Sequence, residues 1–311
     1  QANAVYPGYG FLSESLNFAR LLAAEGNVIF MGPKAEVMGR VADKLSARSL
    51  AHACNVHLFP ASGGLQNAEE AVRAFESMGG PALLKLNAGG GGKGMAIVQS
   101  EADVRSAVPS IMRLGQSIYN DSGFYLEKLI QKPSHIEVQA FNLATVGLRK
   151  CAVQRRNQKI IEETAVLPAD LAEAFLEDAA RILVAAGYGE AGAGTVEFLL
   201  DEESGEFGFL EMNTRLQVEY AVTDLSSGID LVRCQIEHFD GSKVEPGRMP
   251  VVAHAIEVRL YAEDVYNNYA PAPGWLEELD LPGFLGVRTD SGYRAGDRIL
   301  PDYDPMIAKV I

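Results

Sequence analysis

The chain has 311 residues, of which 48% are hydrophobic, so it is long enough to build two or three lobes with substantial cores. Its 27 basic and 41 acidic residues give a net charge of −14, which argues against a nucleic-acid partner. No apolar run approaches the roughly 18 residues of a membrane helix, no signal peptide is visible, and no C-x-x-C pair occurs. We therefore expect an intracellular protein, cytoplasmic or in an organellar matrix, with no membrane partner, disulfide framework or zinc site.

The first part of the chain predicts an α/β fragment. Residues 12–26 read as an amphipathic helix opened by Ser13, and residues 27–30 as a short buried strand. Residues 34–54 have helical spacing, and residues 57–64 carry the proline and glycine of a linker. We therefore place a lobe boundary near residue 58.

Two further lobes are predicted from the remaining pattern. A helix at 67–78, strands at 82–86, 95–99 and 124–129, and a helix after Glu101 predict a small α+β lobe. From His135 onward the strands lengthen and alternate, with a helix between them, over residues 135–141, 145–154, 168–187, 194–200 and 207–213. This pattern favours a mainly antiparallel lobe.

The small lobe contains a glycine-rich loop in KLNAGGGGKGMAIV, residues 85–98. Unobstructed backbone N–H groups in such a loop can converge on phosphate oxygens. A dinucleotide-binding loop needs a helix directly after it, and a Walker loop needs a hydroxyl where Gly94 stands. The remaining interpretation is a strand, glycine flap, strand unit preceded by Lys85, although taken alone the pattern fits a surface hairpin equally well.

Acidic and amide side chains concentrate in GEFGFLEMNTRLQVEY, residues 205–220. If the chain stays extended here, period two places Glu211, Asn213, Arg215, Gln217 and Glu219 on one face. A half-exposed strand would explain that alternation. Glu197, however, is the only charge in the apolar run TVEFLL, and a carboxylate is rarely buried without a partner. Glu197 and Glu211, with Asn213 as a neutral oxygen donor, therefore predict a Mg²⁺ site.

Basic residues stand near these candidate elements. QRRNQK, residues 154–159, holds three cations, and Lys44, Lys85, Arg215 and Arg259 lie elsewhere along the chain. A solvated charged face is the usual meaning of such a run. A bound polyphosphate would require the same local positive charge.

Several motifs in collinear order resemble the biotin carboxylase component of biotin-dependent carboxylases, a branch of the ATP-grasp superfamily. They are YPGYGFLSE, GPKAEVMGRVADKLSAR, LLKLNAGGGGKGM, YLEKLIQKPSHIEVQ, QRRNQKIIEE, GTVEFL, FLEMNTRLQVE, HAIEVRLYAED and YDPMIAKVI. The resemblance implies an α/β (α+β) ATP-grasp fold whose two lobes clasp ATP, preceded by a partial Rossmann-like lobe. The implied domains are 1–58, the remainder of the N-terminal lobe, 59–129, the small lid lobe with the flap, and 130–311, the large lobe and C-terminal region.

The same resemblance implies an ATP-dependent ligase that forms carboxyphosphate from bicarbonate and passes the carboxyl group to biotin. The ATP-binding positions are Lys44, Lys85, Gly90, Gly91, Gly92, Glu127, Lys128, His135, Gln154 and Asn157, and the Mg²⁺ (or Mn²⁺) positions are Glu197, Glu211 and Asn213. Bicarbonate is implied to contact Lys159, Arg215, Gln217 and Val218. The implied catalytic residues are Lys159, Arg215, Glu219 and Arg259. Among them, Glu219 matches the base, and Arg259 matches the arginine that stabilises the biotin enolate. The implied partners are a biotin carboxyl carrier and a carboxyltransferase, as domains or subunits, and a second copy in a homodimer.

The sequence differs from the family pattern at several positions. Tyr6 and Tyr220 stand where the family has histidine, Ala221 follows where it has proline or glycine, and Leu148 to Lys150 replace an acidic Glu-Arg-Asp. The chain starts without Met and lacks the family's first β-α units and last helices, so we expect a piece of a longer protein. Two alternatives stay open: a non-catalytic ATP-binding or assembly module, and another ATP-grasp ligase such as a carbamoyl phosphate synthetase relative.

Overall fold

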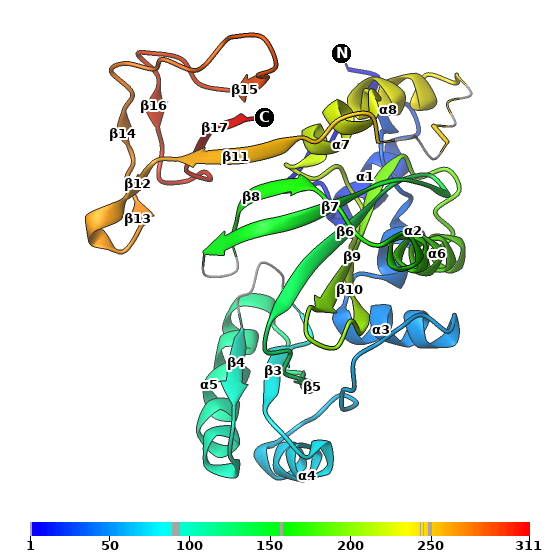
Figure 1. Cartoon of the computed structure of the whole chain (residues 1–311), viewed down its shortest axis with the longest axis vertical. Helices are drawn as coiled ribbons and strands as arrows, with labels where there is room; N and C mark the ends of the chain where they lie inside the picture. The colour runs from blue at the N-terminus through cyan, green and yellow to red at the C-terminus, as the bar shows by residue number, and fades with distance from the viewer. Residues whose placement is uncertain (1, 89–93, 156–157, 243, 245, 248–250) are drawn as a thin grey trace.

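The computed structural model describes residues 2–88, 94–155, 158–242, 244, 246–247 and 251–311. Figure 1 shows a large twisted sheet in the middle of the molecule, a smaller sheet with two helices at one end, and the C-terminal strands at the other. None of the helices in these ranges combines the length and apolarity needed to cross a membrane. All three cysteines are free.

The N-terminal segment pairs two short parallel strands and carries three helices. These elements are β1 (Ala4–Val5), α1 (Leu16–Glu25), β2 (Ile29–Phe30), α2 (Ala35–Arg40) and α3 (Lys44–Ala53). The helix was expected to open at Ser13, but Ser15 is the N-cap of α1, because its hydroxyl accepts the Phe18 N–H. The helical stretch at 34–54 divides into α2 and α3 because Asp43 caps a new helix by accepting the Ser46 N–H.

The small lobe is a three-stranded antiparallel sheet in the order β4-β3-β5, covered by two helices. Its elements are α4 (Ala68–Met78), β3 (Ala82–Leu86), β4 (Met95–Val98), α5 (Glu101–Tyr119) and β5 (Phe124–Lys128). Leu84, Val104 and Phe124 are fully buried between sheet and helices. Burial of each such side chain contributes about 2 kcal/mol, so this lobe has its own core.

The large lobe contains an eight-stranded sheet in the order β10-β9-β6-β7-β8-β11-β17-β15, with every adjacent pair antiparallel, as the alternation predicted. Its strands are β6 (Pro133–Phe141), β7 (Ala144–Arg155), β8 (Gln158–Thr164), β9 (Ala193–Asp201), β10 (Phe207–Asn213), β11 (Ile256–Tyr261), β15 (Thr289–Ser291) and β17 (Met306–Val310). Helix α6 (Ala169–Ala186) packs Phe175 and Ile182 against Phe198 and its neighbours. Helices α7 (Tyr220–Ser227) and α8 (Leu231–Phe239) follow β10.

The C-terminal region extends this sheet and adds short strand pairs, visible in orange and red in Figure 1. Its remaining elements are β12 (Glu263–Asp264), the 3₁₀ helix Val265–Asn267, β13 (Ala270–Pro271), β14 (Gly274–Trp275) and β16 (Arg298–Ile299). Strand β11 pairs with β8 on one side and with β17 on the other. The C-terminal strands therefore stand directly beside the strand that carries Lys159.

Candidate functional site

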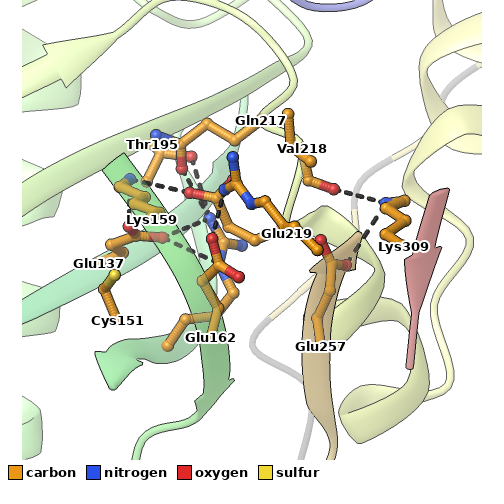
Figure 2. A network of polar contacts seen from close by, with 12 residues as sticks. Glu137, Cys151, Lys159, Glu162, Thr195, Gln217, Val218, Glu219, Glu257 and Lys309 are labelled. Atoms are coloured by element: carbon orange, nitrogen blue, oxygen red, sulfur yellow. Dashed lines mark hydrogen bonds and ion pairs between the residues drawn. The ribbon is translucent and has the colours of Figure 1, made fainter. Parts of the chain in front are cut away.

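Lys159 lies at the centre of a buried set of charged side chains on the large sheet, drawn in Figure 2. Its ammonium group contacts Glu137 on β6, Glu197 on β9 at 2.9 Å, and Glu219 at 2.8 Å. Each carboxylate is at most 2% exposed. Burial alone would lower the pKa of Lys159, but the three carboxylates raise it well above its usual value. Lys159 is therefore a fixed cation that links the sheet to the segment before α7.

Glu219 is held between two cations. One carboxylate oxygen accepts from Lys159, and the other accepts from Arg259 Nη2 at 2.9 Å. Burial would raise the pKa of Glu219, yet Lys159 and Arg259 hold it well below its usual range. Arg259, on β11, also binds the fully buried Glu162 on β8. Glu219 is consequently ionised and precisely oriented.

The chain turns sharply on its way to Glu219. Strand β10 ends at Asn213 and α7 begins at Tyr220, so the expectation of one extended segment through 205–220 is wrong beyond Asn213. Glu14 accepts the Thr214 N–H at 2.9 Å, and the Gln217 carbonyl accepts the Tyr220 N–H at 3.3 Å, which bends the backbone between them. The turn brings Gln217 back to the sheet, where its amide nitrogen lies 2.5 Å from Glu197.

The predicted metal residues come together on β9 and β10. Glu197 and Glu211 are directly paired across the two strands, and the Asn213 amide donates to Glu197 at 2.8 Å. Burial and the neighbouring Glu197 raise the pKa of Glu211, whereas Lys159 and His135 lower the pKa of Glu197 against the effect of burial. Two carboxylates and an amide oxygen suit a hard cation, so this donor set fits Mg²⁺.

A second group of possible ligands comprises His135, Glu137 and Glu197, whose donor atoms lie within 4.8 Å of one another. His135 Nε2 is 2.6 Å from Glu197, and although burial lowers the pKa of His135, Glu197 raises it to about 10. A protonated imidazole has no lone pair for a metal, so His135 cannot complete this set. We therefore favour Glu197, Glu211 and Asn213.

Lysines of the lid and of α3 approach the same region. Lys85 on β3 is 2% exposed and pairs with Glu127 on β5, which also binds Arg48. Lys44 begins α3, and burial lowers its pKa while the nearby Glu211 raises it. Lys44 therefore lies near a carboxylate proposed for the metal, and Lys85 lies near Lys44.

The other predicted residues are spread around this centre. Gln154 Nε2 lies 3.0 Å from His135 Nδ1, and Lys128 is exposed, with its ammonium 3.9 Å from Glu206. Arg215 binds Glu14 at 2.8 Å and Asn213 at 3.1 Å, which places its guanidinium beside the metal set. Gly90, Gly91, Gly92 and Asn157 lie outside the described residues.

Sequence reasoning missed three buried members of the network. Glu137, Arg149 and Glu162 are all 0% exposed, and Arg149 donates to Glu137 at 3.1 Å and to Gln217 at 2.8 Å. Glu137 is the only acidic residue of its predicted strand, the same feature that singled out Glu197. Arg149 carries no comparable signal in its predicted strand, where a second cation, Lys150, follows it.

Tyr6 and Tyr220, two positions that the sequence pattern singled out, lie close together in the structure. Tyr6 and Tyr220 pack against one apolar cluster that includes Leu216. The Tyr220 hydroxyl accepts from Arg288 at 3.0 Å, whereas the buried Tyr6 hydroxyl has no hydrogen-bond partner among the described residues. The carboxylate of Glu219 thus contacts both of its cations in a chain that carries Tyr6 and Tyr220.

Comparisons with known proteins connect this geometry to one family. Successive family models match residues 1–38 (biotin carboxylase, N-terminal domain), 43–245 (carbamoyl-phosphate synthase L chain, ATP binding domain) and 257–311 (biotin carboxylase C-terminal domain). Biotin carboxylase 1 of Bacillus subtilis is 38% identical over 319 residues, an alignment that covers 99% of this chain and 70% of that protein. The chain belongs to the biotin carboxylase family. Its central model is named for carbamoyl-phosphate synthase, but both flanking models and the relatives are of the biotin carboxylase type.

Longer members of the biotin carboxylase family also match. The human mitochondrial propionyl-CoA carboxylase alpha chain is 41% identical over 323 residues, and a putative urea carboxylase of Emericella nidulans is 39% identical over 331. Both alignments include 100% of this chain but only 44% and 26% of those proteins. The chain thus spans less than half the length of these two carboxylases.

Solved biotin carboxylases confirm the expected ATP-grasp fold. The Campylobacter jejuni enzyme, described as a complex with β,γ-ATP, superposes with a TM-score of 0.92 at 38% identity, covering 99% of this chain and 70% of that one. The biotin carboxylase domain dimer of Hydrogenobacter thermophilus 2-oxoglutarate carboxylase, in complex with MgADP, ADP and bicarbonate, also gives 0.92, at 35% identity and the same coverage.

Proposed function

We propose that this chain catalyses the ATP-dependent carboxylation of carrier-bound biotin, the first half-reaction of a biotin-dependent carboxylase. Bicarbonate attacks the γ-phosphorus of ATP and ADP leaves. The resulting carboxyphosphate delivers its carboxyl group to a biotin nitrogen, and the departing phosphate takes the proton of that nitrogen. The observation that carries this proposal is the placement of Glu219 between Lys159 and Arg259, next to Glu197. Bicarbonate and ATP are both anions, and the two cations beside the proposed base can offset the repulsion between them.

Glu219 is proposed as the base that takes the proton of bicarbonate. In the structure Lys159 and Arg259 hold its pKa low, which makes it a weak base. A bicarbonate anion that enters between these groups competes for the same two cations. The pull on Glu219 then weakens, and its pKa rises toward that of an effective base.

Bicarbonate is proposed to be held by Lys159, Arg215, Gln217 and the Val218 backbone. Gln217 is already oriented, since its amide donates to Glu197 and its carbonyl oxygen accepts from the buried Arg149. Arg215 requires a small rearrangement, because its guanidinium is bound to Glu14 and Asn213. Both side chains lie on the turn that follows β10.

The nucleotide is proposed to lie between the lid and the large sheet. Lys44, Lys85 and the Gly90 to Gly92 flap would contact its phosphates, and Glu127, Lys128, His135, Gln154 and Asn157 would complete its site. Glu197, Glu211 and Asn213 would hold Mg²⁺ or Mn²⁺, which supplies charge neutralisation for phosphoryl transfer. Because Lys85 and Glu127 are paired in the structure, we expect nucleotide phosphates to compete with Glu127 for the lysine.

The biotin step is proposed to use Arg259, whose planar guanidinium can stabilise the enolate oxyanion of biotin. The partners would be a biotin carboxyl carrier and a carboxyltransferase, as domains or subunits, inside the cell, and the chain would pair with a second copy of itself. We also propose the domain boundaries 1–58, 59–129 and 130–311. The final acceptor, an acyl-CoA, pyruvate or urea, would be selected by the carboxyltransferase.

The test is ADP release from MgATP with and without bicarbonate and free biotin. Since the chain spans 70% of Bacillus subtilis biotin carboxylase 1, the assay compares the chain with an extended protein that includes any sequence flanking it in the natural protein. We expect release that requires bicarbonate, rises with biotin and is lost in Glu219→Gln. Tight ATP binding without release in the extended protein would instead support the non-catalytic module.

A further inference from the structure

Lys309 connects the C-terminal strand β17 to the segment that carries Glu219. Its ammonium nitrogen lies 2.5 Å from the carbonyl oxygen of Val218, the residue immediately before Glu219 (Figure 2). The side chain is only 3% exposed. The same nitrogen lies 4.1 Å from the centre of the Tyr220 ring, on the other side of Glu219. Lys309 therefore contacts both neighbours of the proposed base.

The register of the sheet determines the face from which the Lys309 side chain projects. Lys309 and Arg259 are directly paired across β17 and β11, so their side chains leave the same face of the sheet. Arg259 binds the carboxylate of Glu219, and Lys309 binds the peptide group just before it. Two adjacent strands thus hold the side chain and the backbone of one residue.

A structural ion pair alone does not account for this arrangement. Lys309 Nζ lies 3.4 Å from Glu257 and 3.6 Å from Asp290, both longer than its contact with the Val218 carbonyl. Burial of an ammonium group is costly, and burial lowers the pKa of Lys309. The segment 214–219 forms neither helix nor strand. The Val218 carbonyl is therefore not part of a regular backbone ladder, and the Lys309 side chain donates the hydrogen bond that it accepts.

We propose that Lys309 is a positioning residue for the proposed biotin carboxylation, fixing the Val218 to Glu219 peptide so that the Glu219 carboxylate meets bicarbonate in the reactive orientation. The inference rests on the proposed function. Lys309 acts through Glu219 and the Val218 backbone, and it touches neither ATP nor the proposed metal residues among the contacts described. Its loss should therefore affect bicarbonate more than nucleotide.

The kinetic test compares Lys309→Met, Lys309→Gln and Lys309→Arg in the extended protein. A displacement of the base by about 1 Å costs on the order of 100-fold in rate. We expect Met and Gln to lower kcat for bicarbonate-dependent ADP release by at least about tenfold and to raise KM for bicarbonate, with KM for ATP unchanged. Arginine, which can still donate to the carbonyl, should restore most of the rate. Lys150→Met, which removes an exposed lysine paired with Glu202 on the same sheet, is the matched control.

Hydrogen exchange provides a readout that needs no turnover. In Lys309→Met, or in Lys309→Gln if the Met variant does not fold, amide exchange in peptides spanning 214–220 should accelerate, while those of α6 stay unchanged. Three results would each overturn the positioning role. The first is an unchanged rate of amide exchange at 214–220, and the second is an equal change in KM for ATP and KM for bicarbonate. The third is a Lys309→Arg variant whose kcat is as low as that of Lys309→Met. Local acceleration in a protein that never releases ADP would support the positioning of Glu219 and count against the proposed function alone.

Discussion

Glu197 and Glu211 stand directly opposite each other on the antiparallel strands β9 and β10, so two carboxylates, the first buried and the second partly exposed, lie on one face of the sheet. Like charges directly opposite one another destabilise a sheet unless a cation lies between them. Lys159 and His135 compensate Glu197, but burial and Glu197 still raise the pKa of Glu211. This pair is the clearest physical reason to expect a divalent ion.

The first prediction concerns this pair. Glu211→Gln removes the repulsion, so without metal we expect the variant to be more stable by about 0.5 to 1 kcal/mol. We expect Mg²⁺ and ADP to raise the Tm of the wild type, and this rise should disappear in the variant. Thermal unfolding with and without Mg²⁺ measures both effects, and Glu203→Gln, an exposed change, is the control. A variant that keeps the full response to Mg²⁺ would show that the metal lies elsewhere.

The second prediction concerns the base. Glu219→Gln preserves the size of the side chain but leaves one acceptor oxygen, so it can accept from Lys159 or from Arg259. Because Lys159 keeps Glu137 and Glu197 and Arg259 keeps Glu162, we expect the variant to fold. Loss of a general base lowers the rate by roughly 10² to 10⁴-fold, and bicarbonate-dependent ADP release should fall by that amount. Nucleotide affinity, measured by calorimetry, should change little. Retention of more than a tenth of the rate would assign the base to another residue.

The third prediction concerns Arg259, which has two roles in the proposal. Because it binds Glu219 as well as Glu162, Arg259→Ala should impair both bicarbonate-dependent ATP cleavage and biotin carboxylation. Arg259→Lys keeps the positive charge but loses the planar fork. We expect Lys to retain most of the ATP cleavage and to lose most of the biotin carboxylation. If Arg259→Lys lost ATP cleavage and biotin carboxylation to the same extent, Arg259 would have no specific role in the biotin step.

The fourth prediction concerns pH and Glu257. Burial raises the pKa of this carboxyl from 4.5 to about 8, more than Lys309 lowers it, while Glu162 and Glu219 add to the rise. The folded state therefore binds a proton that the unfolded state releases, and this contribution to stability is lost as pH rises from about 4.5 to about 8.

Glu257→Gln removes that titration. The free energy of unfolding of the wild type should fall relative to that of the variant as pH rises from 5 to 8, as measured by urea unfolding at several pH values. Glu163→Gln, a neighbouring acid on β8 that is partly exposed, should track the wild type. Parallel wild-type and Glu257→Gln curves over this range would mean that Glu257 is ionised throughout.

The sequence predicts the site best where its residues are close along the chain, or where a residue type is unusual for the strand that contains it. Glu197 is identifiable because it is the one charge in an apolar strand, and Glu211 and Asn213 follow from the period of β10. The same period fails after Asn213, since the bend depends on Glu14, about 200 residues earlier. Periodicity carries no information about such a contact.

Glu162 and Lys309 were not predicted as site residues, and the reason is the same for both. Lys309 and Arg259 face each other only because β17 pairs with β11, and Glu162 reaches Arg259 only because β11 pairs with β8. Strand order and register arise from packing of the whole sheet, which local patterns do not specify. The capping of α1 by Ser15 instead of Ser13 is a smaller error with a local cause, because both serines fit the N-cap pattern.

The central claim is that Glu219, Lys159 and Arg259 together activate bicarbonate for transfer to biotin. The most direct measurement is the incorporation of label from ¹⁴C-bicarbonate into free biotin by the extended protein with MgATP, compared with Glu219→Gln. We predict ATP-dependent carboxybiotin formation in the wild type and a loss of at least about 100-fold in the variant. Equal labelling in both proteins, or ATP cleavage without labelled biotin, would contradict the account.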